Sequence, residues 1–172
     1  MRVTGAALCA ALLAGCASAP ARVSSDPTGN ALSQVEIRSV LDDFHAAAAR
    51  ADAPAYFRLF APSGVFIGTD AGERWDVAAF RAYAEPHFSQ GRGWTYTPRS
   101  RSVFLGPDGR TAWFDELLDS PNYGTSRGTG VLVLTDEGWR IAQYALSFPV
   151  PNGIAKELTA RIREHEARAA PR

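Results

Sequence analysis

Two polar residues stand within a predicted hairpin that is otherwise mostly apolar, and they are the first candidates for chemistry. Arg127 and Gln143 fall on the two strands of this hairpin and share one face in the register that its turn favours. An arginine inside a protein needs a carboxylate close by, because an unpaired buried charge costs several kcal/mol. In the preceding strand, either Asp115 or Glu116 must point to the same side. Two interpretations stay open. Arg127 and Gln143 orient a carboxylate, carbonyl or hydroxyl group of a ligand, or Arg127 forms a structural ion pair with one of these two carboxylates.

The register of that hairpin follows from its turn, Asp136-Glu137-Gly138. A three-residue loop that ends in glycine suits a type I turn followed by a left-handed residue. The pairs that this loop predicts are Thr135 with Trp139, Val133 with Ile141, Val131 with Gln143 and Arg127 with Ser147. Both faces of the hairpin are apolar, whereas a sheet with one wet face alternates apolar and polar residues. We therefore expect the sheet to be covered on both sides.

The three histidines are scattered along the chain. His87 falls on the apolar stripe of a predicted helix, where it is either a satisfied core residue or, like Asp115, a candidate base. His45 lies on the flank of an earlier helical stripe, and His165 belongs to a charged tail. Both cysteines lie in the first tenth of the chain, and no metal-ligand spacing or cofactor motif is present. The sequence predicts neither a metal nor a cofactor.

Aromatic residues make up 10% of the chain, and most of them are expected in the core. Ligand pockets are mainly apolar with a few polar groups. We expect Trp113 and Tyr96 to belong to the wall of such a pocket and to contact a flat, partly apolar ligand.

Helix and strand signals follow one another in an order that defines the fold class. Ser33-Gln34-Val35-Glu36 is a capping box in front of an apolar stripe, and Asp52 and Asp76 precede two further helical segments. A last helix is predicted after Asn152. Strands are predicted at 65–69, 94–105, 111–118, 127–135 and 139–148. Helices followed by a long meander predict an α+β domain, with helices on one face of a curved antiparallel sheet.

Composition limits the possible partners. The chain has 172 residues, of which 18 are basic and 18 acidic, and 46% are hydrophobic. This content fits one globular domain with a substantial core. Because no basic stripe is present, nucleic acid is not expected as a partner.

The first residues have the features of a targeting signal and are not expected to be part of the fold. A short basic start is followed by an apolar run that is too short to span a bilayer as a mature helix. The run ends in Leu13-Ala14-Gly15-Cys16, which resembles the bacterial lipoprotein signal. The resemblance implies that residues 1–15 are removed and that Cys16 carries lipid, so that the protein meets the membrane only through this anchor.

The residues after the cysteine indicate the destination. Ala17 stands where the inner-membrane retention signal has aspartate, which favours the outer membrane, on its periplasmic side. Secretion into the periplasm, with cleavage near residues 17–19, is the alternative. Residues 16–31 are small and polar and read as a flexible tether. Residues 153–172 form a C-terminal helix and tail.

Four segments carry a family pattern within residues 32–152. They are FRLFAPSGVFIGTD, TAWFDELLD, YGTSRGTGVLV and GWRIAQYALSFPVPN. In this order, after two helices, they resemble the SnoaL-like branch of the nuclear transport factor 2-like superfamily. The resemblance implies a cone-shaped roll with a pocket between sheet and helices, and a homodimer formed through the other face of the sheet. It does not imply a reaction, because one fold carries many functions. In the ketosteroid isomerases of this superfamily the base would fall near Gly68, and glycine cannot abstract a proton.

Three functional hypotheses follow. The first is an envelope protein that binds a small, partly apolar molecule, with Arg127 and Gln143 as polar anchors. The second is a cofactor-independent acid–base enzyme of isomerase, cyclase or dehydratase type, with Asp115 or His87 as base and Arg127 stabilising negative charge. The third is an envelope interaction domain whose pocket is vestigial.

Overall fold

The computed structural model describes residues 27–169, which form four helices and six strands. In chain order these are α1 (Pro27–Ala49), α2 (Ala53–Arg58), β1 (Phe60–Ile67), β2 (Arg74–Asp76), α3 (Val77–Phe88), β3 (Thr97–Leu105), β4 (Thr111–Ser120), β5 (Gly124–Thr135), β6 (Gly138–Ser147) and α4 (Asn152–Ala169). Among these residues, no helix is both long and apolar enough to cross a membrane.

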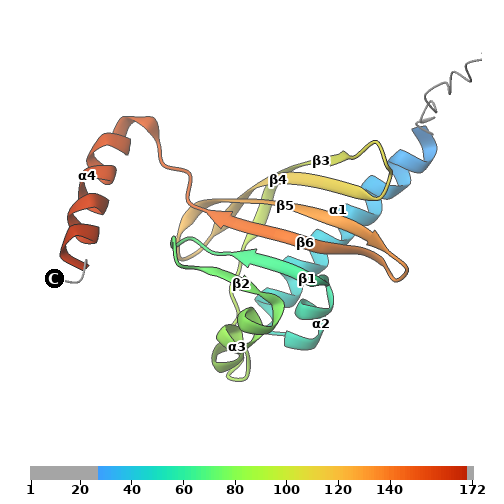
Figure 1. Ribbon diagram of the computed structural model, residues 1–172, viewed down its shortest axis with the longest axis horizontal. Helices are drawn as coiled ribbons and strands as arrows, with labels where there is room; N and C mark the ends of the chain where they lie inside the picture. Colours follow the sequence, from blue (N-terminus) through green and yellow to red (C-terminus); the bar gives the residue numbers. More distant parts are fainter. Residues whose placement is uncertain (1–26, 170–172) are drawn as a thin grey trace, which may run out of the picture.

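The strands form one sheet in the order β2-β1-β6-β5-β4-β3. Figure 1 shows α1, α2 and α3 on one side of this curved sheet and α4 apart from it. The α+β expectation is confirmed. The sheet is mixed, however, because β1 and β6 run parallel while all other neighbours are antiparallel. A parallel pair is possible here because most of the domain, and not a short turn, connects these two strands.

Local signals set the starts of two helices. The Asp52 side chain accepts a hydrogen bond from the Ala55 N–H at 3.1 Å, and that of Asp76 accepts one from the Ala79 N–H at 2.8 Å. These caps confirm the predicted starts of α2 and α3. By contrast, α1 begins at Pro27 and not at the predicted capping box near Ser33. Proline suits the first turn of a helix, so the last residues of the segment assigned to the tether are helical.

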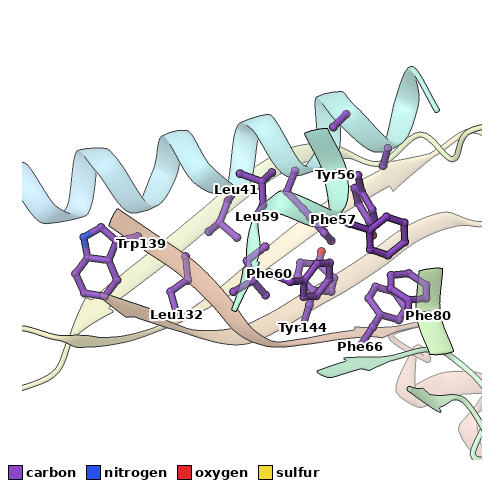
Figure 2. Packing of buried hydrophobic residues seen from close by; sticks show 14 of the residues in the cluster. Leu41, Tyr56, Phe57, Leu59, Phe60, Phe66, Phe80, Leu132, Trp139 and Tyr144 are labelled. Atoms are coloured by element: carbon purple, nitrogen blue, oxygen red, sulfur yellow. The ribbon is translucent and has the colours of Figure 1, made fainter. Parts of the chain in front are cut away.

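The core lies between α1 and the face of the sheet that the helices cover, which we call the inner face. Leu41 of α1 is fully buried there. Toward α3, Phe80 stacks on Phe66 of β1 with ring centroids 4.0 Å apart, and Tyr144 of β6 lies 5.8 Å from Phe66 in a nearly parallel plane. Figure 2 shows these rings between the helices and the strands. Such contacts stabilise the fold strongly, because truncating a buried phenylalanine to alanine costs about 3–5 kcal/mol.

The register of the β5–β6 hairpin is partly different from the prediction. The turn has two residues, since Thr135 pairs with Gly138, and β6 carries one extra residue, Ala142, at a β-bulge. The predicted pairs of Val133 with Ile141 and Thr135 with Trp139 are therefore wrong, whereas Val131 with Gln143 and Arg127 with Ser147 are confirmed. The bulge shifts the alternation of β6, so that Trp139 and Ile141 point inward.

The opposite face of the sheet, called the outer face, is not covered by any described element. Trp113 and Phe104 stack there with centroids 5.9 Å apart, and each is 48% exposed. The helix α4, predicted after Asn152, also stands apart (Figure 1) and buries none of its residues.

Candidate functional site

A cavity of about 290 Å³ opens at the end of the inner face where α2 and α3 meet β1 and β6. Its wall is mainly aromatic. The aromatic lining residues are Phe44, Tyr56, Phe66, Trp75, Phe80, Tyr83, Trp94, Tyr96, Tyr123, Tyr144 and Phe148. Polar lining side chains are fewer, namely His45, Thr69, Glu73, His87 and Arg92. This composition is typical of sites for small organic molecules.

Pairs of stacked rings form parts of the cavity wall. Trp75 of β2 stacks on Tyr83 of α3 at 4.7 Å. Tyr123, in the turn between β4 and β5, stacks on Phe148 at 5.1 Å. The first pair joins two consecutive elements, whereas the second joins the β4–β5 turn to the segment after β6, so this part of the wall exists only in the folded chain.

A buried carboxylate lies beside the cavity. Glu116 of β4 is 1% exposed. Its Oε1 accepts hydrogen bonds from Nε2 of His45 at 2.7 Å and from the Tyr144 hydroxyl at 2.9 Å. Its Oε2 accepts a hydrogen bond from Nε of Arg101 at 2.7 Å. A buried charge is tolerated when it is paired and hydrogen-bonded in this way.

Arg101 connects this group to the surface. Its Nη1 donates to Oδ1 of Asp42 at 2.7 Å and to the carbonyl oxygen of Arg38 at 3.1 Å. The Asp42 side chain is 67% exposed, whereas that of Arg101 is 6% exposed. The chain of contacts therefore runs from the cavity, through His45 and Glu116, to solvent beside α1.

The surroundings set the charge of these groups. Burial raises the pKa of Glu116, but hydrogen bonds and charge interactions with His45 and Arg101 outweigh it and hold the pKa below its ordinary value. Burial lowers the pKa of Arg101, but Glu116 and Asp42 more than offset it, and the net pKa is raised. Glu116 is thus a carboxylate that only accepts hydrogen bonds, so His45 carries a proton on Nε2.

Three tyrosine hydroxyls of the wall stay neutral. Burial, followed by the charge of Glu116, raises the pKa of Tyr144 well above its ordinary value. Burial also raises the pKa of Tyr56 strongly, against a smaller lowering by the nearby Trp94 side chain, and its hydroxyl proton has no acceptor among residues 27–169. Burial and then Tyr123 raise the pKa of Tyr96 to about 12. The hydroxyls of Tyr56 and Tyr96 can donate hydrogen bonds to a bound molecule, whereas that of Tyr144 already donates to Glu116.

The structure separates the residues proposed from sequence. Tyr96 and His87 line the cavity, although His87 is exposed at the end of α3 and does not point into the core. Arg127, Gln143 and Trp113 lie exposed on the outer face, away from the cavity. The expectation that they face the hollow is therefore wrong. In β5 the inward positions are Ser126 and every second residue after it. Arg127 falls between them, and it therefore points to the outer face, as Gln143 of β6 does.

The alternative interpretation, an ion pair between Arg127 and Asp115 or Glu116, is also wrong. Asp115 is exposed on the outer face, where it pairs with Thr129 across the sheet, and is no base for the cavity. Glu116 is the buried carboxylate, but its arginine is Arg101. A buried arginine does have a carboxylate partner here, as expected, but that arginine is Arg101 and not Arg127.

Arg101 was not predicted from the sequence, and His45 was not given a role. The sequence contains signals for some of these residues. In β4 the inward positions include Ala112, Phe114 and Leu118. Glu116 falls in the same alternate series, which marks it as inward-facing. His45 lies eight residues after the buried Ile37, on the same side of α1. In β3, Arg101 alternates inward with Val103 and Leu105, but the apolar Phe104 on the outer face obscures this alternation in the sequence.

No metal centre is formed by the residues that the structure describes, since no three His, Cys, Asp or Glu side chains come together among them. Cys16, the predicted site of lipidation, lies outside this part of the chain.

Comparison with protein families agrees with the geometry. The model of the SnoaL-like domain matches residues 37–151. The chain belongs to the SnoaL-like family. No curated protein sequence matches this SnoaL-like chain.

Solved structures confirm its fold. An NTF2-like protein of unknown function from Pseudomonas putida has a TM-score of 0.60 at 17% identity, covering 71% of this chain and 90% of its own. An NTF2-like protein with a cystatin-like fold from Novosphingobium aromaticivorans has a TM-score of 0.57 at 18% identity, covering 74% and 89%. A protein of unknown function from Nostoc punctiforme, also with a cystatin-like fold, has a TM-score of 0.57 at 14% identity, covering 68% and 91%. At these identities the likeness concerns the fold alone.

Proposed function

We propose that this SnoaL-like domain binds one small, flat, partly apolar molecule in the aromatic cavity. The observation that carries the proposal is the wall itself, in which stacked rings surround a few neutral hydroxyl donors. Flat apolar molecules gain from contact with aromatic faces, while a small number of polar groups set their orientation. SnoaL-like domains include ligand binders and acid–base enzymes.

The cavity size limits the ligand. Sites for small molecules usually measure about 300–1,000 Å³, and this cavity, at about 290 Å³, is at the lower end. A ligand of one ring or two fused rings fits this range better than a larger polycyclic one.

Native mass spectrometry of the protein purified from its own envelope tests the proposal. We expect a co-purifying small molecule, which a Leu146→Trp substitution removes by filling the cavity. Leu146 lines the cavity, whereas its neighbour Ala145 lies on the outer face, so Ala145→Trp is the matched control. An adduct that persists in Leu146→Trp places the ligand elsewhere. Absence of any adduct under gentle conditions, in all three proteins, contradicts the proposal.

A second candidate, acid–base catalysis in the same cavity, is favoured by the His45–Glu116 pair. Glu116 holds a proton on Nε2 of His45, so that Nδ1 is the nitrogen that can accept a proton. Nδ1 makes no hydrogen bond to a described residue, and His45 lines the cavity. In the reaction, a C–H or O–H bond of the bound molecule breaks, its proton forms an N–H bond at Nδ1, and the electron pair stays with the molecule. Return of the proton to another atom completes an isomerisation.

Isotope exchange distinguishes a catalyst from a binder. In heavy water we expect the bound molecule to take up deuterium at a carbon atom with the wild-type protein and not with His45→Gln, while both proteins still bind the molecule. An unlabelled molecule after prolonged incubation with the wild type leaves only the binding function.

We also propose that the protein is held at the outer membrane, on the periplasmic side, through lipid on Cys16, and that it has no other membrane contact. The support is the leader that ends in Leu13-Ala14-Gly15-Cys16. We expect the wild type in the membrane fraction with a lipid-modified Cys16, and Cys16→Ser without this modification. A soluble wild-type protein cut near residues 17–19 supports periplasmic secretion instead.

We further propose a homodimer through the outer face. Half-exposed Trp113 and Phe104 form an apolar pair there that no described element covers. Trp113→Glu is expected to shift the mass measured by light scattering from dimer to monomer. A monomeric wild type at high concentration contradicts this proposal.

A further inference from the structure

Two side chains at the mouth of the cavity have N–H donors that form no hydrogen bond with a described residue. Arg92 and His87 both line the cavity and both are exposed. The backbone N–H of Arg92 donates to the carbonyl oxygen of His87 at 3.0 Å, which holds the two residues together at the C-terminal end of α3. Among residues 27–169, neither side chain makes a hydrogen bond or an ion pair. Their donors are available to a group at the cavity mouth.

Two other arginines near the cavity already have partners. Arg101 is bonded to Glu116 and Asp42. The guanidinium group of Arg81 lies 4.4 Å from the centre of the Phe57 ring, a cation–π contact. Arg92 is therefore distinguished from them by its uncommitted guanidinium group, whose fork of donors matches a carboxylate.

Inside the cavity, the Tyr56 hydroxyl is a second polar group available to a ligand. Tyr56 is 0% exposed and belongs to the cavity wall. The Trp94 indole N–H lies close enough to lower the pKa of Tyr56 in part, but an indole only donates, and the hydroxyl proton of Tyr56 has no acceptor among the described residues. A buried hydroxyl without a hydrogen bond is costly. A polar atom of a ligand at this position would remove that cost.

The geometry points to a planar organic acid as the ligand, with its carboxylate at Arg92 and His87, its ring body along the aromatic wall, and a hydroxyl or carbonyl group at Tyr56. This inference rests on the proposed binding function and names its ligand class. An organic cation is the alternative, because aromatic faces also attract cations and Glu73 lines the same cavity. Glu73 is held in the turn between β1 and β2, since its Oε2 accepts a hydrogen bond from the Asp70 N–H at 3.2 Å, whereas no described residue hydrogen-bonds to the side chains of Arg92 and His87.

Three probes of equal ring size decide the charge that the cavity prefers: a naphthalene carboxylate, the matching carboxamide and the matching methylammonium compound. Isothermal titration calorimetry on the wild-type protein should show the carboxylate binding at least about tenfold tighter than the carboxamide, because charge-assisted hydrogen bonds are the stronger ones. Arg92→Gln should abolish this difference. The control is Arg127→Gln, an exposed arginine of the outer face without an ion pair among the described residues, which should preserve it.

A second comparison tests the contact with Tyr56 at the inner end of the cavity. A hydroxyl group on the far ring of the naphthalene carboxylate should improve binding to the wild type several-fold, and Tyr56→Phe should remove this gain while the parent carboxylate still binds. Gains that are equal in both proteins contradict the role of Tyr56.

The remaining outcomes separate this inference from the function on which it rests. Equal affinity for carboxylate and carboxamide, or tightest binding of the ammonium compound, overturns the organic acid and leaves a cavity that binds small molecules. Failure of all three probes also overturns the inference. Such failure counts against the binding function only when native mass spectrometry of the purified protein finds no adduct either.

Discussion

Asp115 and Glu116 are neighbours in β4 with the same functional group and opposite surroundings. Glu116 is 1% exposed and accepts hydrogen bonds from three side chains. Asp115 is exposed on the outer face. Because successive side chains of a strand point to opposite faces, one step along the chain moves a carboxylate from solvent to the interior. The chemistry available to a residue here depends on the face of the sheet that it occupies.

The arginines of the two faces repeat this contrast. Arg101 is buried, and its guanidinium group joins Glu116 to Asp42. Arg127 lies exposed on the outer face. The inner face carries an ionic network that the core depends on, whereas the outer face carries charges that water can solvate. Substitutions at matched positions test this difference.

The largest expected effect is that of Glu116→Gln. The substitution removes the buried carboxylate of Arg101 and leaves it only the exposed Asp42. Removing one partner of a buried ion pair typically costs about 3–5 kcal/mol of unfolding free energy. Asp115→Asn, one residue away on the outer face, should change it by less than about 0.5 kcal/mol. Urea denaturation of both variants measures the two values. Equal values would contradict the assigned difference between the faces.

Gly128→Ala should cause the next largest loss of stability. Gly128 faces Glu116 across the β4–β5 pair, and a Cβ atom there would collide with the Tyr144 hydroxyl and lie 2.8 Å from Oε1 of Glu116. Overpacking of this kind costs about 1–3 kcal/mol. The same substitution at Gly153 of α4, where a Cβ meets no other atom within 4 Å, should be neutral or slightly stabilising. Thermal unfolding of the two variants provides the comparison.

Tyr144→Phe should have a smaller effect. It removes one hydrogen bond to Glu116 and leaves the contacts from His45 and Arg101 in place, so we expect a loss of about 1 kcal/mol. Tyr123→Phe is the control, because Tyr123 is 63% exposed. A loss above about 3 kcal/mol in Tyr144→Phe would mean that the ionic network depends on all three donors together.

The smallest expected effect is a change in the acid dependence of stability. The pKa of Glu116 is lower in the folded protein than its ordinary value of 4.5. Its contribution to stability is therefore complete above that value and is lost as the pH falls through the folded pKa. The unfolding free energy of the wild type should fall more steeply than that of Glu116→Gln below about pH 4.5. Parallel curves from pH 6 to pH 3 would contradict this role.

Much of the fold is readable from local signals. Asp52 and Asp76 cap the helices that they were expected to cap, since such caps act within three residues. The β4–β5 and β5–β6 hairpins also lie where turn residues predict them. The helix α1 starts earlier than predicted because a capping box does not end a helix that already runs through it.

The candidate site depends on longer-range information. His45 and Glu116 are 71 residues apart, and Arg101 reaches Asp42 across 59 residues. The single extra residue Ala142 changes which side chains of β6 face inward. None of these relations follows from a pattern of neighbouring residues.

The sequence by itself determined the helix caps, the alternation of the strands and the presence of carboxylates at 115 and 116, because these depend on residues a few positions apart. The tertiary structure decided which face of the sheet the helices cover. That choice places Glu116, His45 and Tyr144 beside the cavity and Arg127, Gln143 and Trp113 on the opposite face. The reason is that alternation defines two faces of a strand, while only packing against distant helices makes one of them the interior.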